Sequence, residues 1–129
     1  MKIRAVCLTE NRDRQGSQVS PQVIAAFAEE VNHTPIPLTL GFDSTLAVGA
    51  TSRAEIVGNA LIVEAQINDL RKLDPEKMER LYLAPAFLVK RDTNNERGER
   101  LIVEADLLTL SLVQHHADKY VPPIEILEE

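Results

Sequence analysis

The chain has 129 residues, of which 44% are hydrophobic and 26% charged, a composition that fits one globular domain and excludes a disordered tail. Its net charge of −6 argues against a nucleic-acid-binding surface, because such a surface needs positive charge to displace counterions from phosphates. The single cysteine, Cys7, excludes an internal disulfide and fits a reducing compartment. No apolar run is long enough to span a bilayer, and the N-terminus lacks a signal-peptide core, so we expect neither membrane insertion nor secretion.

The N-terminal quarter predicts a strand, a loop and a helix. Residues 2–9 alternate polar and apolar side chains, which indicates a strand with one solvent-facing side. Residues 10–19 are polar and are expected to form a loop. Ser20 and Pro21 are typical of a helix start, because serine caps free amides and proline tolerates the first helical position. The helix is expected to have one apolar face, formed by residues spaced by four: Val23, Phe27 and Val31. It should end near Asn32.

The rest of the chain is predicted to be rich in strands. A hairpin is expected from residues 49–57 and 60–67 around Gly58-Asn59, a two-residue turn signal. Asp74-Pro75 predicts the start of a second helix, which continues through the charged residues 76–80.

Two further strands are predicted in the last third of the chain. Residues 83–89 indicate a short buried strand in which Pro85 requires an edge position, a bulge or a missing partner. Residues 90–100 are predicted to be an exposed charged turn, and residues 101–113 a long strand. The pentapeptide LIVEA occurs at 61–65 and again at 101–105, which we interpret as two strands with the same alternation.

Three motifs in this order carry a resemblance to a known family. They are Pro-Leu-Thr-Leu-Gly-Phe-Asp at 37–43, Leu-Ala-Pro-Ala-Phe at 83–87, and the long strand-like run at 101–113, which ends in Leu-Ser-Leu-Val. The layout resembles the phage prohead (capsid-maturation) serine proteases, which are relatives of the herpesvirus assemblin fold. The resemblance implies a mainly β protein with helices (α+β), with a compact β-barrel-like sheet and two or three short peripheral helices. Independently of the resemblance, the length predicts one domain over residues 1–129, and Val121-Pro122-Pro123 predicts that residues 121–129 form an extended tail.

The same resemblance implies that the catalytic residues are absent. The place of the family's histidine is Phe42, that of its serine nucleophile is Ala84, and that of its acidic residue is Thr109. A serine protease needs a nucleophile, a base and a group that orients the base, and none of these three side chains can serve. We therefore expect no catalytic, cofactor-binding or metal-binding residues, and we expect Phe42 and Phe87 to pack into the space of the lost catalytic cleft.

Other reactive side chains have simpler interpretations. His115 and His116, with Asp118 nearby, are expected to be solvated turn residues, since adjacent strand residues point to opposite faces and no zinc-type spacing is present. His33 is expected to lie at a helix C-terminus. Ser111 is predicted to be a satisfied core hydroxyl. The remaining candidates are a turn serine, a further serine and an inert core cysteine: Ser44, Ser52 and Cys7.

A protease fold without its chemistry is expected to contribute a surface. The leading hypothesis is a phage virion protein that decorates or cements the assembled head, binds the major capsid protein and forms a homo-oligomer. It would lie on the capsid surface after assembly in the bacterial host cytoplasm. A second hypothesis is a transient assembly factor, as a scaffold or an inactive partner of a prohead protease. A third is an enzyme with a site built from His115, His116 and Asp118.

Overall fold

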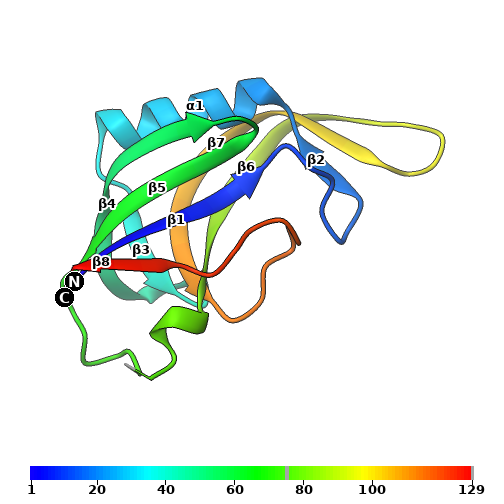
Figure 1. The fold of residues 1–129 in the computed structure, drawn as a ribbon. Helices are drawn as coiled ribbons and strands as arrows, with labels where there is room; N and C mark the ends of the chain where they lie inside the picture. The colour runs from blue at the N-terminus through cyan, green and yellow to red at the C-terminus, as the bar shows by residue number, and fades with distance from the viewer. Residues whose placement is uncertain (75, 129) are drawn as a thin grey trace.

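The computed structural model describes residues 1–74 and 76–128 and is dominated by one β-sheet (Figure 1). The strands are β1 (Lys2–Thr9), β2 (Ser17–Val19), β3 (Pro37–Leu40), β4 (Asp43–Val57), β5 (Ala60–Ile67), β6 (Tyr82–Asn94), β7 (Arg100–Val113) and β8 (Glu125–Glu128). Within the described residues the only helical elements are the α-helix α1 (Pro21–His33) and the 3₁₀ turn η1 (Met78–Arg80). The mainly β class is therefore confirmed.

The sheet curls but remains open along one seam. Its strand order is β2-β7-β3-β4-β5-β1-β8, and β6 pairs with the other edge of β7. β1 lies beside β6, yet the described residues of these two strands form no ladder. The expected barrel-like closure is thus not observed, because backbone pairing stops on both sides of this seam.

The expectation of two or three helices is wrong for the described residues. The charged segment predicted as a second helix forms only η1, while Pro75 of its expected start lies outside the described residues. A five-residue segment cannot repay the entropy of helix nucleation through its own hydrogen bonds. Met78 is its one buried residue, and it anchors the 3₁₀ turn on the core.

The helix α1 begins and packs as predicted. The Ser20 side chain accepts a hydrogen bond from the Val23 amide, and Pro21 is the first helical residue. Val23, Phe27 and Val31 are all buried. The Phe27 ring lies 5.5 Å from that of Phe87 on β6, so the apolar face of α1 completes the core inside the curled sheet.

α1 also fills a gap in the sheet that the short strand β3 leaves between β4 and β7. β3 pairs with β4 only up to Ala50. Beyond that point the Asn32 side chain donates to the Ala54 carbonyl and accepts from the Ala54 amide, at 2.9 and 2.8 Å. These two bonds take the place of the backbone hydrogen bonds that a neighbouring strand would make to Ala54. On the β7 side, the described residues show one hydrogen bond to an α1 side chain: the Glu30 carboxylate accepts from the Leu107 amide at 3.4 Å.

β6 and β7 form a long hairpin that projects beyond the body of the molecule (Figure 1). The predicted turn at 90–100 is confirmed only for residues 95–99, because β6 continues to Asn94 and β7 starts at Arg100. The charges suit paired strands, since Lys90 binds Asp106 across the hairpin at 2.9 Å. The expected loop at 10–19 similarly contains the short strand β2.

Other local predictions are confirmed. The predicted strands at 2–9 and 60–67 match β1 and β5, and Gly58-Asn59 forms the β4–β5 turn. Pro85 lies on β6, which pairs only with β7, next to a register shift at Ala86/Phe87. Within the part of the chain that the structure describes, no helix has the length and apolarity needed to cross a membrane.

Candidate functional site

The sheet register brings two of the three positions that the resemblance assigns to catalytic residues onto one face of the β6–β7 hairpin. Ala84 of β6 lies opposite Ser111 of β7, and Ala86 lies opposite Thr109. Cross-strand partners point to the same face of a sheet, so Ala84 and Thr109 share a face and are offset by one cross-strand pair. The adjacent positions Leu83 and Leu110 are buried in the core, so this shared face points away from it.

The third position, Phe42, reaches the same region on the turn between β3 and β4. Gly41 and Phe42 have φ angles of 57° and 62°, as the two central residues of a tight hairpin turn require. The Phe42 amide donates to the Ser111 hydroxyl at 2.7 Å. The Phe42 side chain remains 52% exposed. A bulky residue in the left-handed region is strained, so the turn holds an exposed aromatic ring at a cost in stability.

The hydroxyl of Ser111 on β7 binds both Thr39 of β3 and the Phe42 turn, and we call this group of contacts the Ser111 hub. This hydroxyl is completely buried, donates to the Thr39 carbonyl at 3.1 Å and lies 3.1 Å from the Thr39 hydroxyl. The prediction of a satisfied core hydroxyl is therefore confirmed. Ser111 stands directly opposite Ala84, yet it serves to fix the Phe42 turn on β7 and has no contact with an imidazole in the described structure.

A cleft of about 570 Å³ lies along the open seam between β1 and β6. Leu8 of β1 lines one side of it, and Ala84 and Phe87 of β6 line the other. Phe42 also lines the cleft instead of filling it. The prediction that Phe42 and Phe87 occupy the space of a catalytic cleft is therefore wrong. Phe87 turns toward Phe27 in the core, and the backbone of the tight turn keeps the Phe42 ring at the rim.

His116 and Asp118 lie in the segment after β7 and are not solvated turn residues. Nε2 of His116 is 2.9 Å from the Cys7 carbonyl oxygen, and Nδ1 accepts from the Asp118 amide at 3.0 Å. The Asp118 carboxylate is 3% exposed and accepts from the Thr9 amide and hydroxyl, at 2.9 and 2.5 Å, and from the Tyr120 amide at 3.0 Å. His115 alone is exposed as expected.

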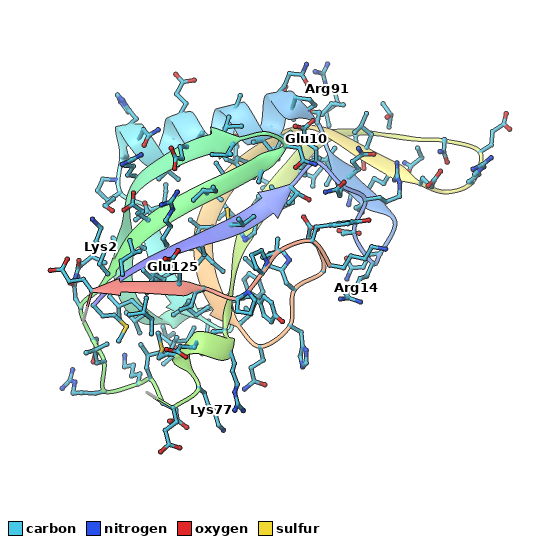
Figure 2. All side chains as sticks on the ribbon, in the orientation of Figure 1. Lys2, Glu10, Arg14, Lys77, Arg91 and Glu125 are labelled. Carbon is cyan, nitrogen blue, oxygen red and sulfur yellow. The ribbon has the colours of Figure 1, made fainter. Side chains whose placement is uncertain are left out.

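These bonds make residues 114–120 a strap along the free edge of β1. β8 pairs with β1 only as far as Arg4, so the backbone groups of Cys7 and Thr9 need other partners. His116 and Asp118 supply them. The strap is also held by the Arg14 amide, which donates to the Ala117 carbonyl; Figure 2 shows Arg14 on the loop between β1 and β2.

The remaining reactive groups are also accounted for by packing. Burial raises the pKa of the Cys7 thiol to about 12, which keeps it protonated and inert, as predicted. His33 lies in the last turn of α1. The described residues hold no group of three or more His, Cys, Asp or Glu side chains placed to bind a metal ion. The strap and the Ser111 hub could not be found from the sequence, because each joins segments about 70 or more residues apart.

The fold is similar to those of a phage capsid assembly protease and a herpesvirus protease. No known protein family and no curated protein matches the sequence. Among solved structures, the bacteriophage T4 capsid assembly protease gp21 superposes with a TM-score of 0.71 at 13% identity, covering 87% of this chain and 80% of that one. Two structures of the Kaposi's sarcoma-associated herpesvirus protease, with allosteric inhibitors bound, give TM-scores of 0.55 and 0.54 at 9% identity. They cover 95% of this chain and 75% and 74% of theirs. The expected prohead-protease-like fold is confirmed.

Proposed function

We propose that this chain is a non-catalytic structural protein of a phage head, which binds the assembled shell as a decoration or cement subunit and stabilises it. The observation that carries the proposal is the hairpin face at which the resemblance places the catalytic residues. Ala84, Ala86 and Leu88 share that face of β6, and Phe42 adjoins it through Ser111. Its exposed apolar side chains, Leu88 and Phe42, suit docking, whereas proteolysis needs a nucleophile and a base.

The state of the nearby polar groups supports the absence of proteolysis. Ser111 is buried and bonded to backbone groups, and His116 has both ring nitrogens engaged by backbone atoms. Asp118 is buried and holds Thr9. In residues 1–74 and 76–128 no hydroxyl or thiol forms a hydrogen bond with an imidazole, so no activated nucleophile of the serine-protease type is assembled.

The exposed aromatic ring is the best single anchor for docking. Phe42 and Leu88 are 52% and 55% exposed, and large apolar side chains dominate the energy of protein interfaces. The turn that presents Phe42 is strained and fixed by Ser111, so the backbone that carries the ring loses little freedom on binding. In this proposal the partner is the major capsid protein, and copies of the chain occupy the outer surface of the head as a homo-oligomer. Assembly takes place in the cytoplasm of the bacterial host.

Cosedimentation with finished, assembled shells of the encoding phage tests the docking. We expect saturable binding that raises the melting temperature of the shell. Phe42→Asn keeps a residue tolerant of the left-handed region and removes the ring, so it should weaken binding at least about tenfold. Val57→Thr removes an equally exposed apolar residue from the distant β4–β5 turn and should change nothing. Binding to immature heads but not to finished shells would favour the transient assembly factor instead.

Labelling by a fluorophosphonate probe tests the non-catalytic part of the proposal. We expect no covalent adduct on the folded chain, since no hydroxyl is activated. An adduct that forms on the folded chain but does not form on a chain denatured before labelling would overturn this part and revive an enzyme with a rebuilt site.

A further inference from the structure

A groove of about 590 Å³ lies between α1 and β7, on the side of the molecule where α1 fills the gap in the sheet. Glu29, Glu30 and His33 of α1 line it, together with Ala105 and Asp106 of β7. The groove is separate from the seam cleft and from the strap. On the edge of β7 that faces α1, no described strand pairs at this point, because β2 pairs with that edge only up to Ile102 and β3 only from Leu110.

The backbone of β7 presents hydrogen-bonding groups to this groove. The Leu107 amide donates to the Glu30 carboxylate, so it points away from β6. Backbone groups of alternate residues point the same way in an antiparallel pair, and the register runs without a shift from Ala105 to Leu107. The groups of Ala105 therefore face the groove as well.

The two sides of α1 differ in how completely they cover the neighbouring strand. On the β4 side, the Asn32 amide makes two short bonds to Ala54. On the β7 side, one carboxylate oxygen at 3.4 Å stands where the carbonyl oxygen of a paired strand would lie. An uncovered strand edge is a template for pairing with another chain.

Charge selects the kind of chain that would fit. Glu29 and Glu30 are exposed and form no ion pair within the described residues, whereas Asp106 is bound by Lys90. The groove is thus negatively charged on its helix side and offers backbone donors and acceptors on its strand side. An extended segment with lysine or arginine side chains matches both features.

We propose that the groove between α1 and β7 docks an extended basic segment of a partner polypeptide, which pairs with the backbone of β7 at Ala105 and Leu107 and places its cationic side chains against Glu29 and Glu30. The site takes its affinity from the strand edge and its selectivity from the two carboxylates. It does not depend on the apolar hairpin face or on the absence of protease chemistry.

The test uses the full chain and a synthetic peptide, acetyl-Lys-Val-Lys-Val-Lys-amide, followed by amide NMR. We expect saturable shifts of the Ala105 and Leu107 amides, with slower exchange of the latter. Glu29→Gln with Glu30→Gln keeps the size of both side chains and an acceptor for Leu107, and should weaken binding at least about fivefold. The matched control, Glu76→Gln with Glu79→Gln, removes two exposed carboxylates near η1 and should leave the affinity unchanged.

A second peptide separates strand pairing from charge attraction. Acetyl-Lys-Pro-Lys-Pro-Lys-amide keeps the charges but lacks two amide donors and cannot extend a ladder, so we expect it to bind at least about tenfold more weakly. Equal binding of the two peptides would overturn the proposal, and so would an affinity insensitive to the Glu29 and Glu30 changes. Shifts confined to other regions would overturn it as well.

Discussion

Replacement of Asp118 by alanine is the sharpest test of the strap, because one buried carboxylate holds three groups. It accepts from the Thr9 amide and hydroxyl and from the Tyr120 amide, and its side chain is almost fully enclosed. In the variant, the Thr9 amide at the free edge of β1 would be buried without a partner.

The cost can be estimated from these contacts. A hydrogen bond to a charged group contributes about 1.5–3 kcal/mol, and an unsatisfied buried donor costs about 1–3 kcal/mol. The three bonds share one carboxylate and do not add fully. We therefore expect Asp118→Ala to lower the free energy of unfolding by about 3–5 kcal/mol, a large part of the roughly 5–15 kcal/mol typical of a domain.

Urea unfolding followed by circular dichroism measures this change. The transition should move to lower urea with an unchanged slope, since the same surface is exposed on unfolding. Glu76→Ala removes an exposed carboxylate and should change the stability by less than about 0.5 kcal/mol. A loss below about 1 kcal/mol for Asp118→Ala would refute the structural role and would return Asp118 to the list of candidate catalytic groups.

Three further predictions follow from individual residues. A Cβ at Gly49 would lie 2.0 Å from the Gln66 carbonyl oxygen, so Gly49→Ala should lower the free energy of unfolding by at least about 2 kcal/mol. Hydrogen exchange should show the loss as weaker amide protection along β4 and β5. Unchanged protection would mean that the two strands separate easily. The pKa of Cys7 is raised to about 12 in the folded state, so the folded chain holds a proton that the unfolded chain releases near pH 9. The contribution of Cys7 to the free energy of unfolding should therefore be retained below about pH 9 and fall by up to about 1.4 kcal/mol per pH unit toward pH 12. Urea titrations of Cys7→Ala across this pH range should lack this decrease. Asn32→Ala breaks the two bonds to Ala54 and should cost about 1–3 kcal/mol in thermal unfolding, whereas a change within error would show that α1 does not need them.

The sequence predicted those elements whose signals are local. Ser20-Pro21 carries its own capping chemistry, and Gly58-Asn59 supplies the backbone freedom of a tight turn, so α1 and the β4–β5 hairpin were located correctly. The repeated pentapeptide shows the limit of such reasoning. The alanine is buried in both copies. Before it, β5 buries Leu61 and Val63, whereas β7 buries Ile102, because a register shift at Val103 reverses the alternation.

The features that the sequence did not disclose depend on distant partners. The charged residues 90–100 were read as a turn because local patterning cannot show that Lys90 faces Asp106 across a hairpin. His116 and Asp118 were expected to be solvated because their partners, Cys7 and Thr9, lie more than 100 residues earlier in the chain. The absence of chemistry at Phe42 and Ala84 stays a prediction, whereas the cleft and the Ser111 hub depend on contacts between distant segments that the sequence does not disclose.

The most direct test of the proposed role is quantitative mass spectrometry of purified mature particles of the encoding phage, with the chain counted against the major capsid protein. The account predicts a full-length chain at a copy number comparable to that of the capsid protein. Absence from mature particles would contradict the decoration role. In that case, detection in immature heads would identify a transient assembly factor.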